Sequence, residues 1–257
     1  MSERNDYPAG VPCWVTNVVR DLPAARAFYE GVFGWTTEGD EPGDSAAYAV
    51  ARLRGRDVAG LAADDVSRGW STEVAVDDLP AAVSRAVEAG GTVLKPPADL
   101  SPIGRLAVLS DPSGAAFGLW EPGDRRGAQL VNESSAWALS ALRCPDPEGA
   151  IAFYGAVFGW EPEAFGAATM CRLPGYFGGV ATQPVSRDVV AVVVPSADPT
   201  PVWRVTFWID DTDAAVSRAA ALGGSVVVPP DDAPGGFRQA LLADPEGGTF
   251  SVSEFAV

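Results

Sequence analysis

The feature that most constrains the fold of this chain is an internal repeat. The stretch "FYEGVFGW" at residues 28–35 returns as "FYGAVFGW" at 153–160, and "VDDLPAAVSRAVEAGGTVLKPP" at 76–97 returns as "IDDTDAAVSRAAALGGSVVVPP" at 209–230. Self-similarity over this length indicates that a whole domain was duplicated, and half of the 257 residues is a usual domain size. We therefore predict two related domains, over 8–124 and 134–257, joined by a polar, glycine-containing linker at 123–135.

Each domain divides again into two similar halves. In the first half, a strand-like run at 13–19 leads into a helix, for which Asp21 is placed as the cap, Pro23 suits the first turn and Gly34 is the stop. The second half has a helix from about Leu79 to Glu88. Further alternating strands are expected at 46–53, 57–63, 70–76 and 115–120. Each half thus reads β-α-β-β-β, and the chain is predicted to be an α+β protein of four βαβββ units.

Several aromatic and basic residues recur at equivalent positions in the two domains. The aromatics of "FYxxVFGW" fall on neighbouring helical turns and are predicted to be core. Trp70 and Trp203 match across the repeat, as do Arg105 and Arg238 beside the "DP" turns. Equivalence after duplication favours a structural role for these four residues, such as holding that turn.

Composition excludes several functions. With 34 acidic and 18 basic residues, the net charge is −16, which is unsuited to the phosphate neutralisation that nucleic-acid binding needs. Membrane insertion is not expected, because no apolar run approaches the roughly 18 residues of a spanning helix. The polar N-terminus lacks a secretory pattern, and Cys13, Cys144 and Cys171 fit small apolar fillers in a reducing compartment. A cytoplasmic protein is expected.

Paired βαβββ units carrying "FY…FGW", "VDD…AAV…AGG" and a terminal "DPxG" resemble the vicinal oxygen chelate superfamily, which includes glyoxalase I, the bleomycin-resistance proteins and the extradiol dioxygenases. The chain looks most like the tandem-domain actinobacterial members, and the resemblance covers almost all of it. It implies two glyoxalase/bleomycin-resistance-like domains, each with its sheet curled into an open cup that holds the ligand site. Binders and unrelated enzymes share this fold, so the fold leaves the function open.

The resemblance also implies where a metal would sit. Enzymes of the superfamily hold a divalent ion with His or Gln on the first strand of a unit and Glu on its last. The matching positions here are Trp14, Ser71 and Gly118 in the first domain, and Leu139, Arg204 and Ser251 in the second. None of these fits, and the chain contains no histidine, a common ligand of zinc and iron. No metal, no cofactor and no metal-dependent glyoxalase or dioxygenase chemistry are therefore expected.

Strand alternation predicts what lines each cup instead. Cup one, the concave face of the first domain, is expected to present Trp14, Thr16, Ser71, Glu73, Gly118 and Trp120. The small Gly118 would leave room for a flat ligand between the two indoles, and Glu73 is the candidate acid or base. Cup two, its counterpart in the second domain, is expected to present Arg204, Thr206, Trp208 and Ser251. The alternatives are that the tryptophans are core, and that Arg204 pairs with a carboxylate at the domain interface.

Three functions stay open at this point. The first is a metal-free protein that binds a large aromatic natural product, cationic or neutral, either for antibiotic self-resistance by sequestration or as an accessory protein in antibiotic biosynthesis. The second is a metal-independent tailoring enzyme, an isomerase, cyclase or hydroxylase-like catalyst, acting through Glu73. The third is a non-catalytic partner of a biosynthetic enzyme. Either a monomer or a homodimer fits the architecture.

Overall fold

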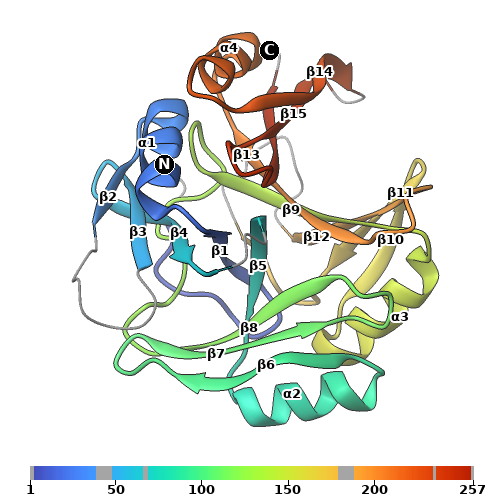
Figure 1. Ribbon diagram of the computed structural model, residues 1–257. Coiled ribbons are helices and arrows are strands. Elements are labelled where there is room, and N and C mark those ends of the chain that lie inside the picture. Colours follow the sequence, from blue (N-terminus) through green and yellow to red (C-terminus); the bar gives the residue numbers. More distant parts are fainter. Residues whose placement is uncertain (1–2, 39–47, 66–68, 179–187, 234–235, 256–257) are drawn as a thin grey trace.

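The computed structural model describes residues 3–38, 48–65, 69–178, 188–233 and 236–255, and it contains two eight-stranded sheets with four helices (Figure 1). The elements of the first half are β1 Pro12–Val19, α1 Leu22–Phe33, β2 Thr36–Glu38, β3 Tyr48–Leu53, β4 Arg56–Ala63, β5 Gly69–Ala75, α2 Leu79–Glu88, β6 Thr92–Asp99, β7 Gly104–Ser110 and β8 Ala116–Pro122. Those of the second half are β9 Trp137–Cys144, α3 Pro147–Phe158, β10 Glu161–Phe165, β11 Ala168–Arg172, β12 Val189–Pro195, β13 Val202–Trp208, α4 Thr212–Ala221, β14 Ser225–Ala233, β15 Phe237–Ala243 and β16 Thr249–Phe255. Residues 46–47 of one predicted strand, and 256–257 at the end of the second predicted domain, lie outside the described part.

Both sheets have one topology, which confirms the four βαβββ units and the α+β class. The first sheet runs β2-β3-β4-β1-β5-β8-β7-β6, and the second runs β10-β11-β12-β9-β13-β16-β15-β14. Within a unit the first and last strands pair in parallel, as β1 does with β4. The two units of a sheet meet through the antiparallel pairs β1–β5 and β9–β13. Each sheet, and therefore each cup, is built by contiguous chain.

All four helices begin at an aspartate cap. The Asp21 carboxylate accepts a hydrogen bond of 2.9 Å from the amide of Ala24, and Asp78, Asp146 and Asp211 cap α2, α3 and α4 in the same way. Such a cap satisfies one of the amides that a helix start leaves without a partner. Gly34 ends α1 at φ 69°, a left-handed conformation that favours glycine. The predicted start and stop of α1 are confirmed. No helix of the described residues is long and apolar enough to span a bilayer.

The two domains pack through the convex sides of their sheets. At the centre, the Thr72 hydroxyl on β5 donates to the Ser140 hydroxyl on β9 at 2.7 Å, with both side chains fully buried. Around this contact α1 lies beside α4, and α2 lies beside α3 (Figure 1). The repeated aromatics cross the interface, since the Phe33 ring is 4.8 Å from that of Phe207 and the Phe117 ring is 5.5 Å from that of Tyr154. The prediction that these aromatics are core is confirmed.

A buried polar cluster joins the two domains at the "FY" tyrosine. The Tyr29 hydroxyl donates to Asp244 Oδ2 at 2.9 Å, and Trp70 Nε1 donates to the Tyr29 hydroxyl at 2.9 Å. The Asn17 amide also donates to Asp244 Oδ2, at 2.9 Å. Asp244 is the aspartate of the "DP" turn in the other domain, so helix α1 of one domain holds a turn of the other.

The equivalent cluster, built around the tyrosine of the second "FY" pair, lies across the same interface. The Tyr154 hydroxyl donates to Asp111 Oδ2 at 3.1 Å, and Trp203 Nε1 donates to the Tyr154 hydroxyl at 2.9 Å. Each domain thus supplies a tyrosine and a tryptophan to hold the other's "DP" aspartate. The structural role predicted for Trp70 and Trp203 is confirmed, and we call these two clusters the reciprocal clasps.

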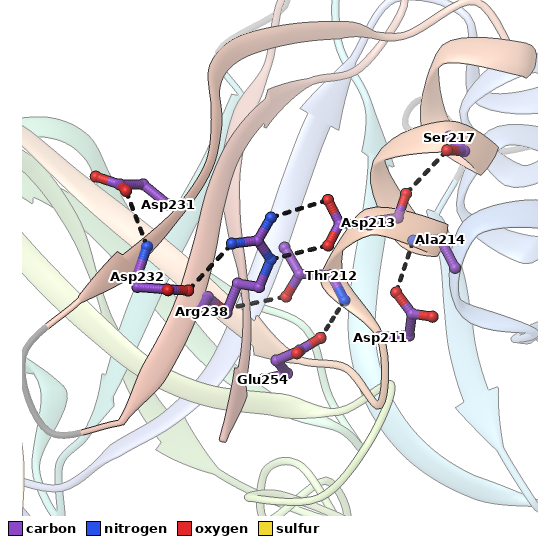
Figure 2. A network of polar contacts seen from close by, with 9 residues as sticks. All are labelled: Asp211, Thr212, Asp213, Ala214, Ser217, Asp231, Asp232, Arg238 and Glu254. Carbon is purple, nitrogen blue, oxygen red and sulfur yellow. Dashed lines mark hydrogen bonds and ion pairs between the residues drawn. The ribbon is translucent and has the colours of Figure 1, made fainter. Parts of the chain in front are cut away.

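The repeated arginines, Arg105 and Arg238, also have structural roles. Arg105 pairs with Glu121 at 3.1 Å, and Glu121 also accepts from the first amide of α2. Arg238 bridges Asp213, in the first turn of α4, and Asp232 on β14, at 2.8 and 3.0 Å (Figure 2). Both arginines therefore hold the start of a helix against its sheet. The structural role predicted for Arg105 and Arg238 is confirmed, although they hold the start of a helix, and the "DP" turn offered as the example is held by the reciprocal clasps.

Candidate functional site

Cup one contains a pocket of about 330 Å³ with mostly apolar walls. Five of the six residues predicted for this cup line it, namely Thr16, Ser71, Glu73, Gly118 and Trp120. They meet because β1, β5 and β8 are neighbours, with Thr16 opposite Ser71 and Glu73 opposite Gly118. The remaining walls come from β1, from the outer strands and from three connections. Their residues are Val18, Tyr48, Ala62, Ala63, Asp64, Lys95, Leu100, Ile103, Leu106, Val108 and Arg125. A volume of this size is enough for a small organic ligand.

Glu73 is the buried acid of this pocket. Its side chain is 6% exposed, and its Oε1 accepts a hydrogen bond of 2.6 Å from the Thr16 hydroxyl. Burial raises the pKa of the Glu73 carboxyl to about 7, although the Thr16 hydrogen bond and the positive charge of Arg125 both lower it. At neutral pH the group is therefore divided between its acid and its carboxylate, as a proton-transfer residue requires.

Trp14 lies beneath the pocket instead of lining it. Its indole is 1% exposed, and Nε1 donates to the Tyr48 hydroxyl at 2.8 Å. The Arg125 guanidinium lies 5.2 Å from the Trp14 ring centroid and 5.1 Å from that of Tyr48, within the range of cation–π contacts. For Trp14, the structure matches the alternative reading of a core residue.

The space beside Gly118 is also filled. A Cβ at this position would lie 2.5 Å from Glu73 Cγ, so the missing side chain makes room for the carboxylic acid. The expected gap between the indoles of Trp14 and Trp120 is therefore absent. Trp120 forms one wall, fixed by a hydrogen bond of 3.0 Å from its Nε1 to the Arg125 carbonyl oxygen.

Two of the lining residues could not be placed from spacing alone. Arg125 lies in the segment that the sequence marks as linker, and its amide donates to the carbonyl oxygen of Ile103, in the connection between β6 and β7, at 3.1 Å. Lys95 pairs with Asp64 at 2.9 Å across the rim, joining β6 to the end of β4. Both depend on the curl of the sheet, for which the sequence carries no periodic signal.

Cup two holds a larger pocket, of about 530 Å³. Three of the four predicted residues line it together, namely Arg204, Thr206 and Ser251. The pocket does not include Trp208, which lines a separate space of about 70 Å³ with Arg4 and Tyr7. The reason is that β13 ends at Trp208, where its backbone pairs with the incoming linker at Ser135 and Ala136.

The residues of neither cup fit the metal that the superfamily implies. Cup one has a single carboxylate on its floor, hydrogen-bonded to Thr16, and cup two has an arginine at a matching position. Within the described part of the chain, no three Cys, Asp or Glu side chains come together as a ligand group. Zinc, manganese and iron need several such donors, and the described residues of neither cup supply them.

The sequence matches the family described as the glyoxalase-like domain twice, over residues 14–120 and 140–253. CFP32 of Mycobacterium tuberculosis (strain CDC 1551 / Oshkosh), which carries the name of a glyoxylase, is 36% identical over 98% of this chain and 97% of its own. The anthracycline biosynthesis protein DnrV of Streptomyces peucetius is 32% identical over 96% and 94%, and DauV of Streptomyces sp. (strain C5), of the same description, is 34% identical over the same shares.

Solved structures show the same fold at low identity. The Mn(II)-bound glyoxalase from Novosphingobium aromaticivorans superposes with a TM-score of 0.66 at 16% identity, covering 97% of this chain and 83% of that one. The 2,3-dioxygenase LapB from Pseudomonas sp. KL28 gives a TM-score of 0.63 at 13% identity, covering 97% and 94%. These similarities support the vicinal oxygen chelate fold. They do not identify the chemistry, which depends on the residues that line the two cups.

Proposed function

Since this chain belongs to the glyoxalase-like domain family, we propose that it is a metal-independent member of that family which binds a flat aromatic natural product in cup one. The observation that carries the proposal is the pocket of about 330 Å³ walled by Trp120 and aliphatic side chains, with one buried acid, Glu73, at its floor. An aromatic wall supplies apolar contact area together with a stacking preference. A single polar group at the floor would fix the ligand's orientation.

The relatives suggest the class of ligand. Two of them carry the name of anthracycline biosynthesis proteins and match over nearly the full length of this chain. Anthracyclines combine a flat fused-ring system with an amino sugar, which is cationic at neutral pH. The net charge of −16 favours the approach of such a cation to the protein. We therefore assign the chain to the biosynthesis of an aromatic polyketide, where the enzyme that makes or receives the ligand is the expected partner.

Binding can be tested by calorimetric titration with a glycosylated anthracycline and with its aglycone, with and without a chelator. We expect saturable binding that the chelator leaves unchanged. Truncation of Trp120 to Leu should weaken it by about tenfold, because loss of an aromatic wall costs on the order of 1–2 kcal/mol. Phe165→Leu is the matched control, since Phe165 is an exposed aromatic of β10, remote from the pocket. Equal affinity in the Trp120 variant would remove cup one as the site.

A metal-independent enzyme is the second candidate, and the pKa of Glu73 favours it. A carboxyl that titrates at about pH 7 can take a proton from a bound ring system and return it elsewhere, as isomerases and cyclases require. Glu73→Gln keeps the shape of the group and the bond from Thr16 but cannot transfer a proton. If this variant binds the ligand as the parent does and loses turnover by about a hundredfold or more, the enzyme is supported. If turnover is unchanged, Glu73 is not the catalyst.

A further inference from the structure

We propose that cup two is a second ligand site, distinct from cup one, and that it takes an organic monocarboxylate with an apolar body. The proposal starts from two arginines on its wall. Arg143 on β9 and Arg204 on β13 both line the pocket of about 530 Å³. Their strands are antiparallel neighbours in which Val202 is opposite Arg143 and Arg204 is opposite Ala141. The two guanidinium groups therefore project from one face, on adjacent strands and two residues out of register.

Neither arginine has a carboxylate partner within ion-pair distance among the described residues. Arg204 Nε is buried and makes no hydrogen bond. Asp198 is the acidic residue whose charge acts on Arg204. Burial, followed by the positive charge of Arg143, lowers the pKa of the Arg204 guanidinium. A buried donor without a partner is costly, so this pair is arranged to be completed by an anion.

The contrast with other arginines of the chain strengthens this point. Arg52, Arg172 and Arg238 each contact two carboxylates. The sequence has 34 acidic residues, so potential partners are abundant. Arg4 and Arg125 also line pockets without a carboxylate partner, but each lies over two aromatic rings. Among the described residues, Arg143 and Arg204 line their pocket with neither a carboxylate nor an aromatic ring as a partner.

The arginines are specific to cup two. Across the repeat, Arg143 corresponds to Val18 and Arg204 to Ser71, both of which line cup one. Duplication therefore does not account for the cationic wall. The same positions carry neutral side chains in cup one and cationic ones in cup two, which indicates two unlike ligands.

The other residues that line the pocket indicate the chemistry of the part of the ligand that carries the carboxylate. Aliphatic side chains form the walls, together with Thr206 and Ser251, which are paired on the neighbouring strands β13 and β16. The aliphatic members are Leu139, Ala141, Val192, Val194, Val228, Ala240 and Leu241. A guanidinium matches the planar, two-oxygen face of a carboxylate. Asp231 and Asp232 also line the pocket and would repel a dianion more than a monoanion, which favours a carboxylate over a phosphate.

The test uses 2-naphthoate as the probe, its neutral amide 2-naphthamide, and the dianion 2-naphthyl phosphate, each titrated calorimetrically into the full chain. We expect saturable binding of the carboxylate, with the amide and the phosphate weaker. Arg204→Gln and Arg143→Gln should each weaken the carboxylate by about tenfold or more, since a charge-assisted hydrogen bond is lost. Arg218→Gln is the matched control, because it removes the same charge from an exposed arginine of α4.

Thermal melting of each variant separates lost binding from lost folding, and Arg204→Lys provides a charge-preserving variant in case the glutamine variant is unstable. The Arg204→Lys variant should bind the carboxylate with intermediate affinity, because lysine keeps the positive charge but lacks the paired N–H donors of the guanidinium. Three results overturn the proposal: no saturable binding of naphthoate, equal affinity for acid and amide, or unchanged affinity in folded Arg143 and Arg204 variants. Tighter binding of the phosphate overturns the assignment to a monocarboxylate. Trp120→Leu is the control for cup one, because naphthoate held in cup two should keep its affinity in that variant. A loss of affinity in Trp120→Leu with none in the arginine variants would place naphthoate in cup one and overturn the proposal.

Discussion

At the scale of single residues, Glu73 shows how burial gives a common side chain an uncommon property. Its carboxyl lies on the floor of an otherwise apolar pocket, with one hydrogen bond from Thr16 and the Arg125 charge nearby. These two contacts are too few to offset the loss of water, so its pKa rises to about 7. The cost appears in the stability of the protein, where it can be measured without knowledge of the ligand.

We expect Glu73 to make stability depend on pH. Between about pH 4.5 and about pH 7 the folded carboxyl keeps a proton that the unfolded chain releases, so the free energy of unfolding falls as the pH rises through this window. Glu73→Gln should abolish that part of the slope. Above pH 7 it should be more stable than the parent by up to about 3 kcal/mol, and the two should differ least near pH 4. Urea unfolding at several pH values measures this, and parallel curves for the two proteins would contradict it.

Gly118 is expected to tolerate no side chain. Its backbone conformation is ordinary, but an added methyl would lie 2.5 Å from Glu73 Cγ. Gly118→Ala should therefore destabilise the fold by about 1–3 kcal/mol and displace the acid. The double variant with Glu73→Ala should recover most of this loss, because the clashing atoms are gone. Thermal or urea unfolding of the single and double variants checks it, and additive losses would show that the clash is not the cause.

At the scale of elements, the two faces of the central strand β1 have different functions. On β1, Thr16 faces cup one while Asn17 faces the other domain and its Asp244. Alternation along the strand therefore links a ligand pocket to the domain interface within one residue. Helices α1 and α3 add aromatic contacts across the interface, through their repeated "FY" pairs.

Tyr29→Phe tests how much a reciprocal clasp contributes to the free energy of unfolding. The change removes one hydroxyl that donates to Asp244 and accepts from Trp70, and it leaves both groups buried. We expect a loss of about 1–3 kcal/mol in the free energy of unfolding. Tyr176→Phe is a suitable control, since this tyrosine is partly exposed and lies outside both clasps. A loss no larger than that of the control would show that the clasp is a minor contribution.

The sequence predicted elements better than it predicted the site. Caps, glycine stops and alternation are local signals, and Asp21, Gly34 and the helix at 79–88 were placed correctly from them. Strand alternation also placed Thr16, Ser71 and Glu73 on one face. It failed to show that Trp14 is covered by Tyr48 and Arg125, because that contact depends on sheet curvature and on a connection far along the chain. The pairing of Tyr29 with Asp244 was hidden for the same reason, since 215 positions separate them.

At the scale of the whole molecule, the two domains share one core. The rings of Phe33, Phe207 and Phe250 meet across the interface, and the Thr72–Ser140 hydrogen bond lies at its centre. Each cup, in contrast, is lined by a single domain. The two domains therefore share one continuous hydrophobic core, whereas each ligand pocket belongs to one domain.

This arrangement predicts one cooperative unfolding transition for both domains. Because each domain buries side chains of the other, neither should remain folded after its partner unfolds. Calorimetry should give a single peak whose van't Hoff and calorimetric enthalpies agree, and ligands of either cup should shift that one peak. Two resolved transitions, each sensitive to one ligand, would show that the domains fold separately.

The reciprocal clasps have a consequence for the history of such a chain. Each half of the duplication holds the other through its convex side, so a change in Tyr29, Trp70 or Asp244 is felt by both halves at once. The concave sides are under no such joint constraint, and Ser71 and Arg204 show how far equivalent positions have diverged. Selection can therefore exchange the chemistry of one cup while the other goes on serving its earlier purpose, which makes the duplicated chain a stable frame for acquiring new specificities.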